Sequence, residues 1–524
     1  MYNRYVIANY QGKLKMKIGR TKNASRNILF GGFLKAYQTL AIFLMRTALI
    51  YFMGMQYLGL NSLFTSILQV LNLAELGVGS AMVYSMYKPI AENDRKTICA
   101  LMHLYKKYYM IIGFVIAIVG IILLPFIPNL IKMDTVPSGI NVYVLYLLNL
   151  MSTVLSYWLF AYKNCLITAH QRTDIGSKII IIMNTLQYVG QLVVLIIFKS
   201  YYYYIIVALG MQVLTNFVTA VVIGKMYPEY KAIGQLEKSV VNQINGRVKD
   251  LFTAKIGAIV VNSVDTIVIS AYLGLTVLAV YQNYYFILNA IFGFFYIIFS
   301  GITAGMGNSF VTESIDKNYD DLKLFSFIIN WLICICCCCF VCLYQPFMLL
   351  WVGGEYVLPY SFVVLFCIYF YIYVLSLVWA TAKDAAGMWH SDRFRPLIGA
   401  IANLAMNLAF VKIIGLYGIL LSTILSYILI TMPWLICNLS KELYKRSMLS
   451  YVFTVGKQVI VTGVSCIISF FCCSLIKVDG IIGLIVYVII CFTISNIVQY
   501  LSFCRIDEYS KAKKLVQNIL KQGR

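Results

Sequence analysis

The chain alternates long apolar stretches with short polar connectors from residue 28 to residue 504. Each stretch is long enough for a tilted helix to cross about 30 Å of hydrocarbon. A helix satisfies its own backbone hydrogen bonds, which lipid cannot do. The pattern therefore predicts an all-α polytopic membrane protein with fourteen transmembrane helices, at 28–54, 59–87, 108–131, 141–162, 179–198, 202–224, 251–273, 280–307, 324–345, 357–382, 396–414, 416–438, 452–476 and 480–504.

Lysine and arginine collect in alternate connectors. If the N-terminus is cytoplasmic, the inward connectors and the two termini contain 34 of the 42 Lys and Arg residues. The outward connectors then contain three of them, Lys132, Lys199 and Lys477. Cytoplasmic connectors of membrane proteins are enriched in basic residues. We therefore predict that both termini are cytoplasmic, because one missing helix would invert the bias in every later connector.

Composition narrows the class further. The chain is 61% hydrophobic and 12% charged, whereas soluble domains contain about 25% charged residues. A net charge of +22 would suggest a nucleic-acid partner in a soluble protein, but here it follows the membrane topology, and we expect no nucleic-acid ligand. Six of the 15 cysteines lie between Cys334 and Cys342, inside one apolar stretch. Without a Cys-x-x-Cys loop or a histidine partner, they are interpreted as packing residues, and no metal site is predicted.

Two short motifs recur in the second half of the chain. Tyr57-Leu-Gly-Leu60 matches Tyr272-Leu-Gly-Leu275, and Lys163-(x6)-His170 matches Lys383-(x6)-His390. Matched motifs of this kind indicate an internal repeat. We predict a cytoplasmic basic N-terminus, a six-helix lobe, a cytoplasmic linker, a second six-helix lobe, two further helices and a basic cytoplasmic tail, at 1–26, 27–225, 226–250, 251–440, 441–504 and 505–524.

Polar and charged residues occur inside several predicted helices, where they are costly and commonly functional. The span 28–54 carries Lys35, Thr39 and Arg46 on one face. The span 59–87 carries a polar stripe at helical spacing, consisting of Ser62, Ser66, Gln69, Asn72, Glu75 and Gly79. Later spans carry two further polar groups, Lys255 with Asn262 and Asp265, and Asn403 with Asn407. These stripes predict a hydrated cavity between the two lobes.

Simpler interpretations remain open for each group. Lys35 and Lys255 lie near the cytoplasmic end of their spans, where long side chains reach the interface. Glu75 and Asp265 are either protonated packing residues or partners of Arg46 and Lys255 in buried ion pairs. The Asn, Ser and Gln side chains are also the kind that join helices by hydrogen bonds within a membrane.

The deep charges suggest a class of substrate. Basic side chains outnumber acidic ones, which favours an anion such as a phosphate or pyrophosphate. Two mid-span carboxylates, Glu75 and Asp265, are candidates for coupling transport to H⁺ or Na⁺. No Gly-x-x-x-x-Gly-Lys-Ser/Thr motif is present, so ATP-driven transport within this chain is not expected. No other cofactor is predicted.

A family resemblance rests on particular segments. Residues 45–89 contain Met-Arg-Thr-Ala, Tyr-Leu-Gly-Leu-Asn-Ser-Leu-Phe, Ala-Glu-Leu-Gly-Val-Gly-Ser-Ala and Met-Tyr-Lys-Pro. Further matching segments are Val264-Asp-Thr-Ile-Val-Ile-Ser270, Gly307-Asn308, Trp351-Val-Gly353 and Gly387-Met-Trp-His with Arg393-Phe-Arg-Pro396. Over residues 16–445 the chain resembles the Wzx-type flippases of bacterial polysaccharide biosynthesis, which belong to the multidrug/oligosaccharidyl-lipid/polysaccharide (MOP) exporter superfamily.

The resemblance implies a transporter, not an enzyme. It implies alternating access for an undecaprenyl-pyrophosphate-linked oligosaccharide, moved from the inner to the outer leaflet of the bacterial plasma membrane, for surface glycans such as O-antigen or capsule. Polymerases and glycosyltransferases of the same pathway would be partners. By position, Arg46 and Lys255 would contact substrate, Glu75 and Asp265 would couple or gate, and the cytoplasmic mouth would be lined by Lys383, Asp384, Arg393 and Arg395.

Two alternatives remain at this point. One is another exporter of the superfamily, for drugs or for a cell-wall lipid precursor. The other is a membrane-embedded polymerase or glycosyltransferase, which would need a catalytic loop outside the membrane. The predicted outward connectors are too short for such a loop.

Overall fold

The computed structural model describes the backbone of residues 2–75, 77–476, 478 and 480–522. Within it, the side chains of residues 2–25, 28, 250–251, 253–262, 304, 516 and 519–522 lie outside the described set. All regular secondary structure of the described chain is helical. The chain forms two compact units, one ending at Thr276 and the other beginning at Val277. Each unit is described by itself.

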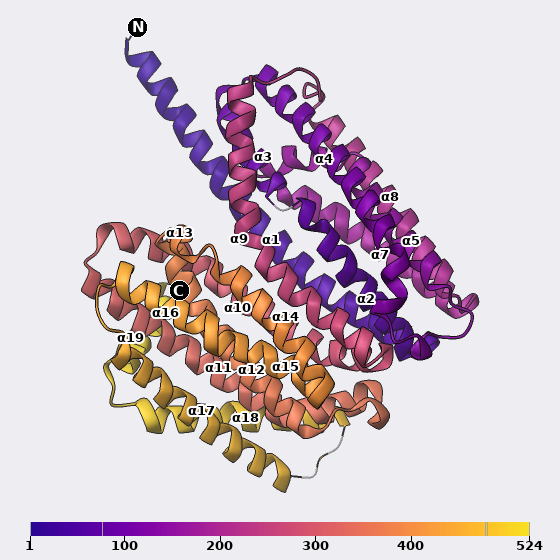
Figure 1. Cartoon of the computed structure of the whole chain (residues 1–524). Coiled ribbons are helices and arrows are strands. Elements are labelled where there is room, and N and C mark those ends of the chain that lie inside the picture. The colour runs from indigo at the N-terminus through magenta and orange to yellow at the C-terminus, as the bar shows by residue number, and fades with distance from the viewer. Residues whose placement is uncertain (1, 76, 477, 479, 523–524) are drawn as a thin grey trace. The chain divides into compact units, whose positions relative to one another are not determined.

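The first unit is a bundle in which α1 packs along α7, α7 along α8, and α2 along α9 (Figure 1). Buried aliphatic side chains on α2, α4 and α5 form its core. Its helices are α1 (Tyr2–Met53), α2 (Met55–Leu71), α3 (Val78–Glu92), α4 (Arg95–Leu123), α5 (Val142–Trp158), α6 (Asn164–Ala169), α7 (Thr173–Ile197), α8 (Tyr201–Met226) and α9 (Lys238–Tyr272).

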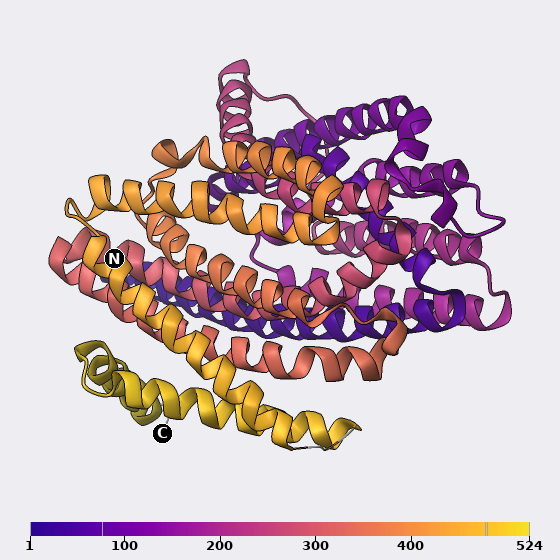
Figure 2. The same cartoon turned by 60° about the horizontal axis from the view of Figure 1, so that its bottom comes forward.

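The second unit is built around α11, against which α12, α17 and α18 all pack. Aromatic rings join α10, α11 and α12. Phe292 of α10 stacks on Phe370 of α12 with ring centroids 5.6 Å apart, and Phe340 of α11 meets the same ring edge to face at 4.9 Å. The yellow helices at the end of the chain lie together along one side of this unit (Figure 2). Its helices are α10 (Leu275–Thr312), α11 (Ile315–Val352), α12 (Tyr360–Ala385), α13 (Trp389–Asp392), α14 (Arg395–Ile414), α15 (Leu416–Ser426), α16 (Met432–Asn438), α17 (Leu449–Leu475), α18 (Gly480–Phe503) and α19 (Asp507–Gln522).

The prediction of an all-α polytopic membrane protein is confirmed. Twelve segments of the described chain are helices long and apolar enough to cross a membrane. The pair Val142–Trp158 and Ala161–Ala169, which overlaps the span predicted at 141–162, is bent by 46° and adds a thirteenth if it counts as one span. The span predicted at 251–273 lies within α9, whose described apolar part is Ser263–Tyr272.

The two compact units differ in extent from the two predicted lobes. The helix at 251–273 was assigned to the second lobe, whereas α9 packs against α2 and α3 and groups with the first unit. One pair of repeated motifs is nevertheless in contact: a Cβ atom on Gly59 would lie 2.2 Å from the carbonyl oxygen of Leu275. Gly59 therefore allows α2 to approach the turn after α9 closely. The lobe boundaries and the two-fold repeat stay predictions.

Candidate functional site

The second predicted membrane helix is broken in its middle. It consists of α2, a 3₁₀ turn at Asn72–Glu75, and α3. Gly77 precedes α3 with a φ of +89°, a left-handed conformation that favours glycine. The polar stripe predicted along 59–87 therefore does not run along one regular helix, although Gly79, beyond the break, still lies beside Glu75: a Cβ atom there would lie 3.9 Å from Oε1 of Glu75. Broken membrane helices expose backbone and polar side chains at transport sites.

The side chains of the stripe differ in exposure. Ser66 is buried and Ser62 is half-buried on α2, while Gln69 is exposed. Asn72 and Glu75 lie in the 3₁₀ turn, where both are half-buried. The break thus brings one amide and one carboxylate of the stripe together.

Glu75 is held by tyrosine hydroxyls. Tyr109 on α4 donates a hydrogen bond to Oε1 of Glu75 at 2.5 Å, and Tyr157 on α5 donates to Oε2 at 2.8 Å. The Tyr157 hydroxyl also lies 3.1 Å from Oδ1 of Asn72. Tyr105, one turn before Tyr109, donates to the Tyr109 hydroxyl at 2.5 Å. Glu75 and Asn72 are predicted site residues, whereas the three tyrosines are not, because tyrosine is too common in this chain to stand out.

A cavity of about 520 Å³ lies beside this network. Its wall includes Tyr105 on α4, and the remaining lining residues come from α3 and α6, namely Gly79, Ser80, Val83, Tyr84, Tyr87, Cys165 and Thr168. Most of its polar groups are hydroxyls. The first unit therefore contains a carboxylate with a hydroxyl-lined cavity a short distance away.

The predicted basic residues of the first unit do not gather at one described point. Lys35 is exposed on α1, whereas Arg46 is half-buried and interacts with Tyr204 of α8. Asp265 is buried on α9. The side chains of Lys255 and Asn262 lie outside the described residues. The roles of these residues toward a substrate stay predictions.

Three of the four residues predicted at the cytoplasmic mouth form an ion cluster in the second unit. Nζ of Lys383 lies 2.6 Å from Oδ1 of Asp384 and 3.0 Å from Oδ2 of Asp392. Arg395 donates to Asp392 from Nε at 2.6 Å and from Nη2 at 2.8 Å. Asp392 and Lys383 are both buried. The fourth residue, Arg393, is exposed and lies over the ring of the adjacent Phe394.

The first unit contains a similar cluster. Asp174, buried at the start of α7, lies 2.9 Å from Nε of Arg26 and 3.1 Å from Nε of Arg172. In both units the aspartate follows the repeated Lys-(x6)-His motif, four residues after His170 and two after His390. Sequence reasoning missed both aspartates, although this proximity to a repeated motif was a usable signal.

Asn403 and Asn407 occupy the interior of a helix pair. Both are fully buried on α14. The amide of Asn403 donates to Oγ1 of Thr423 on α15 at 3.0 Å, and Asn407 donates to Asn403 at 3.2 Å. Ser422 of α15 donates to Oδ1 of Asn407. This is the arrangement expected of side chains that join two membrane helices.

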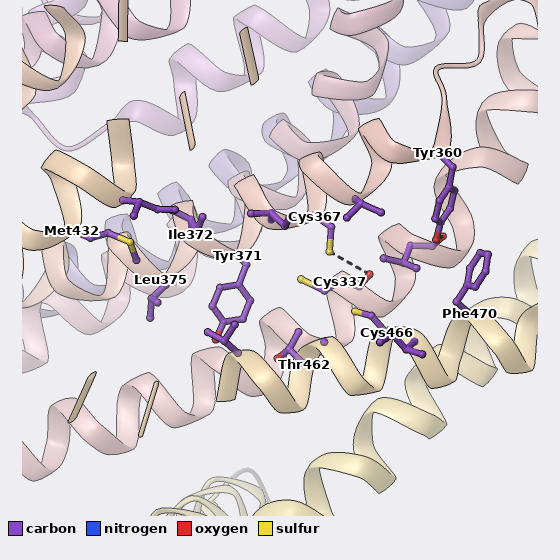
Figure 3. Close-up of a pocket in the computed structure, with 17 residues that line it drawn as sticks. Cys337, Tyr360, Cys367, Tyr371, Ile372, Leu375, Met432, Thr462, Cys466 and Phe470 are labelled. Carbon is purple, nitrogen blue, oxygen red and sulfur yellow. Dashed lines mark hydrogen bonds between the residues drawn. The ribbon is translucent and has the colours of Figure 1, made fainter. Parts of the chain in front are cut away.

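The second unit also contains an apolar pocket of about 640 Å³ (Figure 3). Helices α11, α12 and α17 supply most of its lining. Two of its hydroxyl groups are used elsewhere, because Tyr371 donates to Asn330 at 2.5 Å and Tyr360 donates to the carbonyl of Val341 at 3.1 Å. Carbon and sulfur atoms therefore form most of the pocket surface. Its volume is typical of ligand sites.

The cysteine-rich run packs against other helices, as predicted. Cys334, Cys338 and Cys342 form one face of α11 against Cys473 of α17 and Cys491 of α18. The Sγ atoms of Cys342, Cys473 and Cys491 lie within 4.8 Å of one another. Among the described residues, these three thiols are the group close enough together to bind a metal ion.

Solved structures, but no curated protein sequences or family profiles, are similar to this chain. No protein-family profile matches the chain. No curated protein matches it in sequence. Solved structures do: the lipid II flippase MurJ in an inward closed conformation is 15% identical, with a TM-score of 0.66, over 91% of this chain and 99% of that one. A multidrug-resistance MATE transporter of the MOP superfamily in an inward-facing conformation is 13% identical, with a TM-score of 0.58, over 77% and 94%.

A third similar structure is a MOP-superfamily transporter from Pyrococcus furiosus, 12% identical, with a TM-score of 0.51, over 80% of this chain and 95% of that one. At these identities the likeness concerns the fold. This chain is a multi-pass membrane protein with the fold of MOP-superfamily transporters.

Proposed function

We propose that this chain, which has the fold of the MOP transporters, is a flippase for an undecaprenyl-pyrophosphate-linked oligosaccharide. It would move the oligosaccharide from the inner to the outer leaflet of a bacterial plasma membrane by alternating access. The product would supply surface polysaccharide synthesis, with the polymerase and glycosyltransferases of that pathway as partners. The resemblance to Wzx-type flippases supports the oligosaccharide, and the fold shared with MurJ supports a lipid-linked substrate.

The observation that carries the lipid-linked class is the apolar pocket between α11, α12 and α17. A polyprenyl chain needs an apolar surface along which to move, and this pocket offers one. Burial of such a chain is favourable by about 25 cal/mol per Å² of apolar surface. In this proposal the pocket holds part of the prenyl chain while the charged headgroup moves.

The headgroup and the driving ion are assigned to other residues. Arg46 and Lys255 remain the proposed contacts for the pyrophosphate, since a pyrophosphate is bound best by basic side chains. Glu75 is the proposed coupling carboxylate. Both of its oxygens accept hydrogen bonds from tyrosine hydroxyls, and it is half-buried in the turn between α2 and α3.

Two glycines on α17 allow a matched test of the pocket. Gly463 lines the pocket, and Gly456 does not; a Cβ atom on either would meet no atom within 4 Å. Gly463→Leu should therefore place a side chain in the pocket with open space at its Cβ atom, while Gly456→Leu adds the same side chain outside the pocket. In proteoliposomes containing a fluorescent undecaprenyl-pyrophosphate-linked oligosaccharide, translocation should fall at least about tenfold in the first variant, or about 1.4 kcal/mol, and stay unchanged in the second.

Equal activity in both variants would contradict a role for the pocket. Transport of lipid II in preference to the oligosaccharide would instead favour a cell-wall precursor flippase, the substrate named for the similar MurJ structure.

A further inference from the structure

We propose that Tyr105 and Tyr109 form a proton relay between the cavity beside α3 and Glu75. The proposal rests on the ion coupling assigned to Glu75 under the proposed function. It identifies the coupling ion as a proton and gives it a route through two phenolic hydroxyls.

The relay is a continuous chain of hydrogen bonds. The Tyr105 hydroxyl donates to the Tyr109 hydroxyl at 2.5 Å, and the Tyr109 hydroxyl donates to Oε1 of Glu75 at 2.5 Å. The two rings lie one helical turn apart on α4, with centroids 4.3 Å apart. Both tyrosines are almost fully buried, at 4% and 6% exposure. The chain therefore crosses a region from which most water is excluded.

The cavity meets the relay at Tyr105. Tyr105 lines the cavity, whereas Tyr109 and Glu75 do not. Gly79 makes this possible, since a Cβ atom at that position would lie 3.1 Å from the Tyr105 hydroxyl and 3.9 Å from both the Tyr109 hydroxyl and Oε1 of Glu75. The absence of a side chain at Gly79 keeps the start of the relay open to the cavity.

The proton movement balances without a further reactant. When Glu75 is protonated, its carboxyl proton passes to the Tyr109 oxygen as the Tyr109 proton passes to Tyr105 and the Tyr105 proton passes to water in the cavity. Uptake is the reverse, and both phenols return to their neutral form. Hydroxyls suit this task because each donates one hydrogen bond and accepts another.

The arrangement fits a proton better than a sodium ion. Tyr109 and Tyr157 both direct donor hydrogens at the Glu75 oxygens, which a bound cation would have to displace. Other titratable or charged groups near the site are the buried Cys165 thiol beside Tyr105 and, on α9, Arg247, whose guanidinium carbon lies 4.7 Å from the ring centroid of the cavity residue Tyr84. Residues 253–262 of α9, which include Lys255, have side chains outside the described residues.

The test separates the rate of Glu75 protonation from its midpoint. A pH jump on the purified full-length protein, followed by infrared spectroscopy, reports the carbonyl band of protonated Glu75, identified by its loss in Glu75→Gln. Tyr105→Phe keeps the ring and does not touch Glu75. It should slow protonation at least about tenfold, within the range for assisted proton transfer, and leave the midpoint unchanged. The wild-type protein should be protonated more slowly in D₂O than in H₂O, and this isotope effect should be smaller in Tyr105→Phe.

Tyr157→Phe is the matched control. It removes a hydrogen bond to the other Glu75 oxygen but lies off the relay, so it should move the midpoint without slowing the reaction. Gly79→Ala provides a second variant, because its methyl group crowds the Tyr105 hydroxyl and should also slow protonation. Unchanged rates in both Tyr105→Phe and Gly79→Ala, or equal slowing in Tyr157→Phe, would overturn the relay. The measurement needs no lipid-linked substrate, so a failure of the proposed flippase activity would leave its outcome intact.

Discussion

Replacing Asp392 by Asn should destabilise the second unit more than any other single change in its ion cluster. Asp392 is 3% exposed and is the shared partner of Lys383 and Arg395. Removing one member of a buried ion pair costs about 3–5 kcal/mol, because the other charge is left buried. Lys383 would keep its contact with Asp384 at 2.6 Å, and the Asp384 side chain is 49% exposed. The loss in free energy of unfolding should therefore be about 3 kcal/mol, the lower end of this range.

The similar cluster of the first unit supplies the control. Asp174 is buried, but the side chains of Arg26 and Arg172 are 28% and 33% exposed and can be hydrated when the carboxylate is lost. Asp174→Asn should therefore cost only about 1 kcal/mol. The buried cysteines allow a direct assay, since a thiol-reactive dye reports their exposure as the protein unfolds in detergent.

A second change tests the physical reason. Adding Lys383→Met to Asp392→Asn removes the unpaired buried ammonium and should recover part of the lost stability. Two results would refute the idea that burial of the unpaired charge sets the cost. One is equal destabilisation by Asp392→Asn and Asp174→Asn, and the other is a double variant that is less stable than Asp392→Asn alone.

Two further variants test local features of the fold. Gly59→Ala places a methyl group against a backbone carbonyl oxygen 2.2 Å away and should lower thermal stability by about 1–3 kcal/mol, the cost of overpacking, whereas Gly456→Ala, with open space around it, should not. Asp94 caps α4 by accepting from Thr97, and these hydrogen bonds lower the pKa of its carboxyl group. Its stabilisation is complete above the ordinary Asp pKa of about 3.9 and is lost as pH falls through the lower folded value. The stability gap between the wild type and Asp94→Ala, measured across acid pH, should therefore close on acidification; a constant gap would contradict this.

Much of the fold follows from the sequence, because hydrophobic length decides where a membrane helix forms. The predicted span 452–476 corresponds to α17 at Leu449–Leu475, and 480–504 corresponds to α18 at Gly480–Phe503. Length and hydropathy do not report a break inside a span, however. The 3₁₀ turn at Asn72–Glu75 and the bend after Trp158 interrupt apolar stretches that look continuous in sequence.

The candidate site was predicted only in part, for a related reason. A charged residue in an apolar stretch is conspicuous, so Glu75 was found, whereas Lys383 and Arg395 were named through the family resemblance. Their partners were not, since Tyr105, Tyr109 and Asp392 become significant only through contacts. Asn403 and Asn407 were conspicuous in the sequence, but their setting was not. A polar pair on one helix face indicates either a hydrated cavity or hydrogen bonds between helices, and only the packing distinguishes the two.

The central claim is that the chain moves a lipid-linked oligosaccharide between leaflets. Its most direct test reconstitutes the full-length protein into vesicles that contain an undecaprenyl-pyrophosphate-linked oligosaccharide. An impermeant glycan-cleaving enzyme added outside then measures how much of the substrate lies in the outer leaflet. The account predicts that an imposed proton gradient drives net movement to one leaflet and that Glu75→Gln abolishes this movement. Unchanged leaflet distribution in the wild type, with transport of a cationic drug under the same gradient, would contradict it.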